Sequence, residues 1–283
     1  MDETRDLPIS GWRAQRQLRY ITLMKIATFN VNSIKARVDT VLTWFKQAQP
    51  DVACLQEIKC ENNAFPHLEF EALGYNCTIL GQKSYNGVAL ISKHKIEDVR
   101  QGLPGDAADE QSRYLEGVVS TKTGAVRIAT IYAPNGNPPD TDKYPYKLKW
   151  MDRLIAHTET LLAYEEPLVL GGDYNIIPEP EDVYDPRGWV NDALFKLETR
   201  QKLRRMINLG LTDAFRACNA QAGQYTFWDY QAGAWQKDRG IRIDHLLLSP
   251  QAADNLKTCV IDKKVRAWEK PSDHVPIWIE LAA

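Results

Sequence analysis

Polar side chains that can offer oxygen ligands follow several short apolar runs of this sequence. Asp173 and Asn175 come after the run 167–170 and two glycines, and their spacing would place both on one side of a strand end. A carboxylate and an amide carbonyl are hard oxygen donors, which suit Mg²⁺ or the steering of a water molecule. Because Asp and Asn are also ordinary turn residues, this pair alone is a weak signal.

Residues of the same kind stand at the predicted ends of other strands. The full set is Asn30, Asn32, Glu57, Tyr132, Asn135, Asp173, Asn175, Asp244, Asp273 and His274. Catalytic groups tend to stand on loops held by rigid strands, so these residues could meet at one edge of the fold. An oxygen-rich set with one histidine suits the Mg²⁺-assisted hydrolysis of a phosphoester. The chain has no Gly-x-Ser-x-Gly elbow, Walker loop or Rossmann fingerprint that would favour another chemistry.

Short strands and amphipathic helices must position these side chains. Strands are predicted at 25–31, 51–57, 75–80, 87–91, 115–120, 125–132, 167–170, 225–230, 241–248 and 275–281. Helices are predicted at 34–49, 144–164 and 191–209. No linker divides the chain, so residues 24–283 are expected to form one domain in which two sheets pack face to face. Residues 1–23 are expected to be a poorly ordered extension.

The composition excludes some functional classes and locations. A net charge of −2 over 283 residues gives no global attraction to nucleic acid, so any DNA contact needs a local basic face. No apolar run approaches the roughly 18 residues needed to cross a bilayer, and no membrane partner is expected. The five cysteines form no C-x-x-C pair, which argues against disulfides or structural zinc and favours a reducing, cytoplasmic location.

Four segments resemble the signatures of the exonuclease III family, within the endonuclease/exonuclease/phosphatase superfamily. They are 55–59 (Leu-Gln-Glu-Ile-Lys), 172–176 (Gly-Asp-Tyr-Asn-Ile), 242–244 (Arg-Ile-Asp) and 270–276 (Lys-Pro-Ser-Asp-His-Val-Pro). Order, spacing and residue type agree at all four. The resemblance implies an α/β fold of the deoxyribonuclease I type, a four-layered sandwich of two mostly antiparallel sheets flanked by helices.

The resemblance also implies an activity, a cofactor and a substrate. The enzyme would be a monomer that uses Mg²⁺, with Mn²⁺ able to substitute. It would repair double-stranded DNA by cutting the phosphodiester 5′ to an abasic site. It would also act on 3′ ends, as a 3′–5′ exonuclease and by removing blocking groups.

Metal ligands follow from the resemblance residue by residue. Glu57 would be the primary ligand, since a hard cation prefers carboxylate oxygen. The positions assigned to the metal are Asn30, Glu57, Asp173, Asn175 and Asp273. Many members of the family carry an acidic residue where this chain has Asn32, so ligation by Asn32 stays open.

The catalytic groups implied by the resemblance are Tyr132, Asp173, Asn175, Asp244 and His274. Asp173 would either deprotonate the attacking water or protonate the leaving oxygen, and both roles stay open. His274 would donate to the phosphate as charge develops, with Asp244 behind it to favour the charged ring. Tyr132 would place its hydroxyl near the scissile phosphate, whereas His245 is expected to be a packed side chain.

Contacts to DNA are implied at Arg113, Asn135, Phe227 and Trp228. Many relatives read Trp-Phe where this chain reads Phe227-Trp228, and adjacent residues of a strand face opposite sides. Phe227 should therefore face the pocket, and Trp228 should lie in the core or at its rim. Weaker candidates for phosphate contact are Lys59, Lys143, Lys147, Arg239 and Lys270, for which a solvated surface charge is the alternative.

Two other functions share the same metal-site residues. A phosphoesterase of the same superfamily could act on a lipid or inositol phosphate, but Lys59, Arg113, Arg242 and the aromatic pair favour DNA. A non-catalytic DNA-binding protein on the same fold should have lost ligands, and every expected polar position is filled here.

Overall fold

The computed structural model describes residues 23–121 and 124–282. The expectation that residues 1–23 form a poorly ordered extension therefore falls outside the described residues, except at Leu23. No helix in the described part of the chain is both long and apolar enough to cross a membrane.

Two six-stranded sheets form the centre of the molecule, with strand orders β11-β12-β1-β2-β4-β3 and β5-β6-β7-β8-β10-β9. The first sheet contains β1 (Leu23–Asn30), β2 (Val52–Gln56), β3 (Asn76–Leu80), β4 (Val88–Ser92), β11 (Leu256–Ile261) and β12 (Ile277–Ala282). The second contains β5 (Ile96–Gln101), β6 (Tyr114–Thr121), β7 (Gly124–Tyr132), β8 (Leu168–Asp173), β9 (Thr212–Asp213) and β10 (Asp244–Leu248). Among the described strands, only β1–β2 and β7–β8 are parallel pairs, so both sheets are mostly antiparallel, as predicted.

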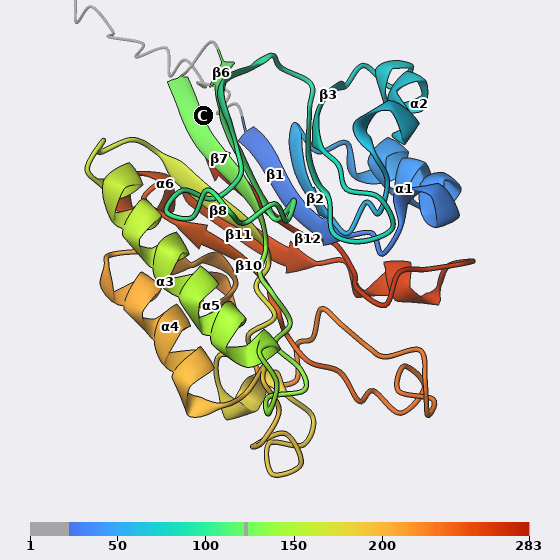
Figure 1. The fold of residues 1–283 in the computed structure, drawn as a ribbon. Helices are drawn as coiled ribbons and strands as arrows, with labels where there is room; N and C mark the ends of the chain where they lie inside the picture. The colour runs from blue at the N-terminus through green and yellow to red at the C-terminus, as the bar shows by residue number, and fades with distance from the viewer. Residues whose placement is uncertain (1–22, 122–123, 283) are drawn as a thin grey trace, which may run out of the picture.

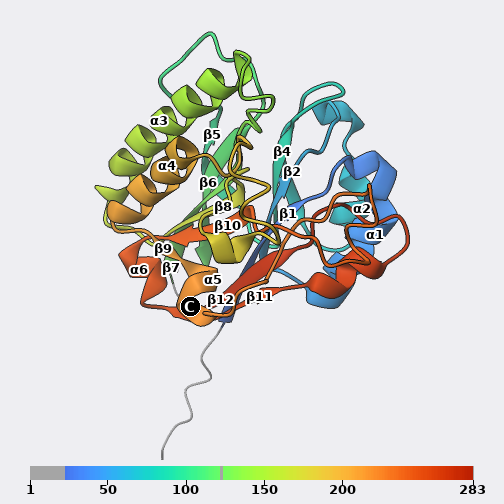
Figure 2. The same ribbon diagram turned by 90° about the horizontal axis from the view of Figure 1, so that it is seen from below.

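Helices cover the outer face of each sheet (Figures 1 and 2). The helices are α1 (Ile34–Ala48), α2 (His67–Glu71), α3 (Lys143–Leu162), α4 (Leu197–Asn208), α5 (Ala214–Cys218) and α6 (Pro250–Ala253). Helices α1 and α2 lie on one side of the paired sheets, and α3 and α4 lie on the other. Apolar side chains such as Ile26, Val169 and Leu246 fill the space between the sheets. The predicted four-layered sandwich is confirmed.

Helix α1 returns the chain so that β2 runs parallel to β1. The Ser33 hydroxyl accepts from the backbone N–H of Ala36 at the start of α1. The helix ends at Ala48, and the capping residue Gln49 adopts a left-handed conformation just before Pro50. Helix α3 connects β7 to β8 in the same way. Because both strands of a parallel pair end at one edge of the sheet, the residues that follow β1, β2, β7 and β8 can meet there.

Two glycines at the end of β8 allow close packing around this edge. A Cβ atom on Gly172 would lie 2.0 Å from the backbone oxygen of Ile131 on the neighbouring strand β7. A Cβ atom on Gly171 would lie 2.9 Å from Leu246 and 3.4 Å from Cys54, which belongs to the opposite sheet. A larger residue at Gly172 would push β8 away from β7, and one at Gly171 would require the Leu246 side chain to move.

Some predicted elements differ from the structure. The helix predicted at 191–209 begins only at Leu197, because the Asp192 side chain accepts from the backbone N–H of Leu194 and holds a turn there. The segment predicted as a strand at 225–230 forms only isolated bridges, from Phe227 to Ile241 and to His274. The strand predicted at 241–248 begins at Asp244, and the edge strands β5 and β11 were not predicted.

A buried ion-pair network anchors the segment that leads into β10. The Arg242 guanidinium is fully buried; its Nε lies 2.7 Å from Asp182 and its Nη1 lies 2.8 Å from Asp213. Arg242 therefore has no exposed surface with which to contact DNA. Burial would raise the pKa of Asp182, but hydrogen bonds and charge from Arg242 and Arg216 outweigh it and lower that pKa.

We expect Asp182→Asn to lower the free energy of unfolding by about 3–5 kcal/mol at pH 7, because it removes one partner of a buried ion pair. The pKa of Asp182 is below the ordinary 3.8, so this stability is present above about pH 4 and is lost as the pH falls through the lowered value. Denaturant titrations at several pH values should show a smaller difference between variant and wild type in acid. A difference that stays constant with pH would contradict the assignment.

Candidate active site

The predicted strand-end residues converge at one edge of the sandwich. β1 ends at Asn30, Glu57 follows β2, and β8 ends at Asp173. β10 runs antiparallel to β8 and pairs Asp244 with Asp173, while His274 precedes β12. The site therefore lies at the end of β12 opposite to the C-terminus marked in Figure 1.

Asn30 joins the two sheets at this edge. Its buried amide nitrogen donates to Glu57 Oε1 and to Asp173 Oδ2, both at 2.9 Å. Its amide oxygen accepts from the backbone N–H of Asn32 at 3.0 Å. Glu57 belongs to the first sheet and Asp173 to the second, so a single amide fixes the spacing between the two carboxylates.

Glu57, Asp173 and His274 form a compact cluster. One ligand atom from each lies within 4.8 Å of the others. His274 Nδ1 is 2.9 Å from Asp244 Oδ2, and His274 Nε2 is 3.8 Å from Asp173 Oδ2. The buried Oδ1 of Asp244 has no hydrogen-bond partner among the described residues.

The pKa values at the cluster reflect burial and crowded negative charge. Burial, with further repulsion from Asp244 and Glu57, raises the pKa of Asp173 to about 7 despite the opposing charge of His274. Burial would lower the pKa of His274, but Asp244 and Asp173 raise it to about 10. Burial would raise the pKa of Glu57, but Lys59 and Asn30 outweigh it and lower that pKa. The imidazole is thus charged at neutral pH among three acids.

A divalent cation fits this donor set. Glu57 and Asp173 offer carboxylate oxygens, the ligands that Mg²⁺ prefers. The raised pKa of Asp173 and the unpaired oxygen of Asp244 both indicate a shortage of positive charge at the site. Glu57 and Asp173 would hold the ion.

The other residues assigned to the metal surround this cluster. Asn30 presents its amide nitrogen, not its oxygen, to the two carboxylates. Asn175 Oδ1 accepts from Asn135 Nδ2 at 3.0 Å, and the backbone N–H of Asn175 donates to Asp173 Oδ1 at 2.8 Å. Asp273 Oδ1 accepts from Asn32 Nδ2 at 3.0 Å. The structure brings all of them to the same edge.

Two cations flank the cluster. Lys59 Nζ lies 2.7 Å from Glu57 Oε2 and donates to Asn32 Oδ1 at 2.6 Å. The Arg113 guanidinium stacks over the Tyr132 ring with its carbon 4.7 Å from the ring centre. Burial, together with Glu57, raises the pKa of Tyr132 well above the ordinary value. The Tyr132 hydroxyl is therefore a proton donor at neutral pH.

Phe227 and Trp228 lie on opposite sides of their segment, although it is not a regular strand. The Phe227 ring is half-buried and contacts the His274 ring edge-on, with 4.9 Å between centroids. Trp228 is fully buried, and its ring nitrogen donates to Asp238 at 3.0 Å. The predicted orientation of the pair agrees with the structure, and Trp228 has no exposed surface with which to touch DNA in this conformation.

Sequence reasoning misplaced one lysine and missed a supporting serine. Lys147 was a weak candidate for phosphate contact, with a solvated surface charge as the alternative, but it is fully buried behind the site. The Ser272 hydroxyl donates to the backbone oxygen of Asn30 at 2.8 Å and accepts from the backbone N–H of His274 at 3.2 Å. The position of Ser272 two residues before His274 could have suggested this turn.

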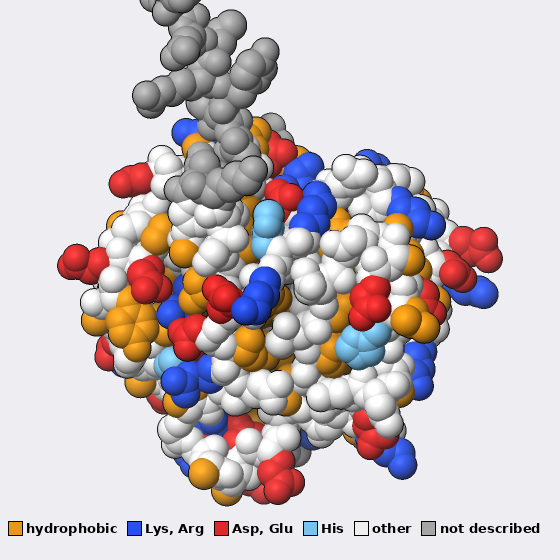
Figure 3. Space-filling view, turned by 90° about the horizontal axis from the view of Figure 1, so that it is seen from above, with side chains coloured by type: hydrophobic (Ala, Val, Ile, Leu, Met, Phe, Trp, Pro, Cys, Tyr) orange, Lys and Arg blue, Asp and Glu red, His pale blue; other side chains and the backbone are white. Residues whose placement is uncertain are grey.

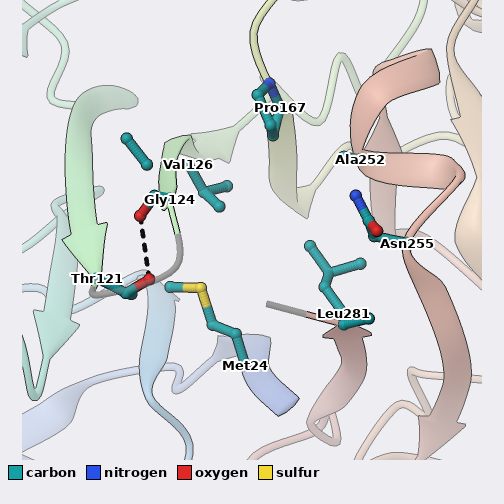
Figure 4. A pocket seen from close by; sticks show the side chains of 10 residues that line it. Met24, Thr121, Gly124, Val126, Pro167, Ala252, Asn255 and Leu281 are labelled. Atoms are coloured by element: carbon teal, nitrogen blue, oxygen red, sulfur yellow. Dashed lines mark hydrogen bonds between the residues drawn. The ribbon is translucent and has the colours of Figure 1, made fainter. Parts of the chain in front are cut away.

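A separate pocket lies where the same strands begin, at the far end of the sandwich (Figure 4). It has a volume of about 260 Å³ and is lined by residues such as Met24, Val126 and Leu281. None of its ten lining side chains is ionisable, so it lacks the groups for phosphoester chemistry. On the face shown in Figure 3, acidic and basic side chains are interspersed, and the picture shows no concentrated basic patch.

Comparison with known proteins identifies the family. The model of the "Endonuclease/Exonuclease/phosphatase family" matches residues 27–274. The chain is 35% identical to exodeoxyribonuclease III of Haemophilus influenzae, over 91% of this chain and 99% of that protein. It is 31% identical to the DNA repair nuclease APEX1 of Danio rerio, over 92% of this chain and 82% of that protein.

Solved structures agree with this result. An AP endonuclease from Archaeoglobus fulgidus has a TM-score of 0.87 and 36% identity, over 92% of this chain and 100% of that one. A variant of the 3′ phosphatase NExo from Neisseria, bound to a product DNA hairpin, has a TM-score of 0.88 and 37% identity, over 91% and 99%. With the converging acids, asparagines and histidine described above, these similarities show that the chain belongs to the endonuclease/exonuclease/phosphatase family, in its exonuclease III group.

Proposed function

We propose that this protein is a Mg²⁺-dependent DNA repair nuclease that hydrolyses the phosphodiester 5′ to abasic sites. We further propose 3′–5′ exonuclease and 3′-end-cleaning activity on double-stranded DNA. The observation that carries the proposal is the cluster of Glu57, Asp173 and His274, held within 4.8 Å at the seam between the sheets. Relatives named as exodeoxyribonuclease III and DNA repair nuclease support the choice of DNA as substrate.

Each residue of the site has a proposed role. Bound Mg²⁺, or Mn²⁺ in its place, would polarise the phosphate and neutralise its charge. Glu57 and Asp173 would hold the ion, with Asn30, Asn175 and Asp273 as further proposed ligands or supports. Asn30 and Asn175 each donate a hydrogen bond to Asp173, and Asp273 accepts one from Asn32.

Proton transfer would involve Asp173, at the end of β8, and His274, just before β12. Asp173 would either take the proton of an attacking water or protonate the leaving oxygen, and both roles stay open. His274 keeps a proton on Nε2 for the phosphate, because Asp244 faces its Nδ1 at 2.9 Å. Asn175 and the Tyr132 hydroxyl donate to the phosphate oxygens.

Fewer residues are proposed to bind the substrate than the sequence indicated, because Trp228 and Lys147 are buried. Arg113 and Asn135 flank the cluster and suit contacts to the DNA backbone. Phe227 presents a half-buried ring beside His274, where a sugar without a base could pack. We propose that the enzyme acts as a monomer in the cytoplasm.

A lipid or inositol phosphate is the alternative substrate class. The names of the relatives do not favour it. Incubation with sphingomyelin or an inositol polyphosphate, beside an abasic duplex, separates the two: turnover of the former without nicking of the latter would replace our proposal.

We expect a labelled abasic duplex to be nicked in Mg²⁺ and EDTA to stop the reaction. Glu57→Ala and Asp173→Asn should each reduce nicking by roughly 100-fold or more, because each removes a charge that holds the ion at the reacting phosphate. A product gel with a plain blunt duplex in parallel lanes measures both activities.

The matched control is Glu71→Ala, which removes an exposed carboxylate from α2 and should leave nicking unchanged. Undiminished nicking by the Glu57 and Asp173 variants would exclude the assigned site. Tight binding of the duplex without any nicking by the wild type would favour the non-catalytic protein.

We expect the loss of activity in Asp244→Asn to grow as the pH rises from about 6 to 9. Asp244 is the largest of the interactions that hold the pKa of His274 up at about 10, against burial. Without it that pKa falls, so less imidazole stays protonated as the solution becomes alkaline. The ratio of variant to wild-type kcat at each pH corrects for titration of the substrate, and a ratio independent of pH would contradict this role.

We expect Phe227→Ala to reduce nicking of abasic DNA more than digestion of a blunt duplex. The Phe227 ring beside His274 is suited to a baseless sugar, which a normal 3′ end does not present. Trp228→Phe is the control: it removes the buried hydrogen bond to Asp238 and should lower stability without changing the ratio. An unchanged ratio in Phe227→Ala would remove Phe227 from lesion recognition.

A further inference from the structure

Lys147 is the only lysine among the described residues that is fully buried. It stands on α3, and among the described residues its Nζ makes no ion pair within 4.0 Å; burial lowers the pKa of Lys147 to about 7. Burying an ammonium without a carboxylate partner is expensive, and proteins rarely retain one without a use for it. Packing does not require it, because Trp150, Met151 and Leu154 already supply the apolar face of α3.

Nζ of Lys147 has two hydrogen-bond partners, both on loops of the candidate site. Nζ donates to the backbone oxygen of Asn135 at 3.0 Å and to the backbone oxygen of Asn175 at 2.5 Å. Asn135 follows β7 and Asn175 follows β8. The side chains of the same two residues are bonded to each other at 3.0 Å. Asn135 and Asn175 are therefore linked in two ways: by the hydrogen bond between their side chains, and by Lys147 Nζ, which donates to the backbone oxygen of each.

The chain around Lys147 is shaped to admit its side chain. A Cβ atom on Gly136 would lie 2.7 Å from Lys147 Cδ and 3.2 Å from Ala193 Cβ. Gly136 also has a φ of +89°, which other residues rarely adopt. The loop that carries Asn135 therefore passes closely over the lysine stem.

We propose that Lys147 is a positioning residue that locks Asn135 and Asn175 together from behind the site, in the geometry in which they meet the phosphate. This proposal rests on the proposed function for the role of the two asparagines. It predicts that a loss at Lys147 acts through Asn175 and not through the stability of the fold.

The test replaces the ammonium with an apolar group of similar length, in Lys147→Met. We expect kcat per folded molecule to fall roughly 10- to 100-fold, as for a small misplacement of catalytic groups, with a smaller change in KM. In Asn175→Ala, the added Lys147→Met should have little further effect, because the residue that it positions is already lost. Lys149→Met is the matched control, since Lys149 is an exposed lysine two residues further along α3.

A readout independent of catalysis is the side-chain amide resonances of Asn135 and Asn175 in NMR spectra. They should shift in Lys147→Met and stay in place in Lys149→Met. If Lys147→Met does not fold, Lys147→Leu, which also lacks a donor, takes its place with the same expectations.

Unchanged amide resonances overturn the proposal, as do wild-type kcat or additive effects of the two substitutions. A wild-type protein that fails to nick abasic DNA contradicts the proposed function instead. In that case the amide resonances still decide whether Lys147 holds the pair.

Discussion

The site depends on one hydrogen-bonded amide, that of Asn30, which is shared between a carboxylate of each sheet. Glu57 and Asp173 repel each other, and burial strengthens the repulsion. The Asn30 amide nitrogen lies 2.9 Å from both and keeps them at a defined separation. The structure thus holds negative charge at a spacing that a divalent cation can satisfy. His274 and Lys59 supply part of the compensating positive charge at either side.

A buried polar layer below Asn30 fixes the register of the sheets. The Gln56 amide nitrogen donates to the Thr130 hydroxyl of the opposite sheet at 2.9 Å, and the Thr28 hydroxyl donates to the Gln56 amide oxygen at 3.2 Å. Each of these residues lies one or two positions before a residue of the site on its own strand. These hydrogen bonds would break if one sheet slid against the other. The layer therefore fixes how the strands that carry the site residues lie relative to one another. The glycines of β8 allow the approach that these bonds require.

The sequence predicts the layers and the edge at which polar residues meet, because hydrophobic alternation and turn residues are local signals. It also places Phe227 toward the site and Trp228 inside, since alternation survives in a segment with only isolated bridges. It does not predict the burial of Lys147 or Arg242, because a charged residue is normally a surface residue and only the folded chain shows its partners. The edge strands β5 and β11 escape prediction because their exposed faces weaken the apolar pattern. The functional roles of the site residues remain predictions.

Each half of the chain contains one parallel strand pair, β1–β2 in the first half and β7–β8 in the second, and each pair contributes to the site. Each pair, joined by its long helix, presents one acid at its end: Glu57 from the first half and Asp173 from the second. Asn30 hydrogen-bonds to both acids, and its bond to Asp173 joins residues that are 143 positions apart in the sequence. Neither half can assemble the cluster alone, so a nascent or partly unfolded chain lacks the means to cut. The hydrolytic activity can therefore arise only once folding is complete.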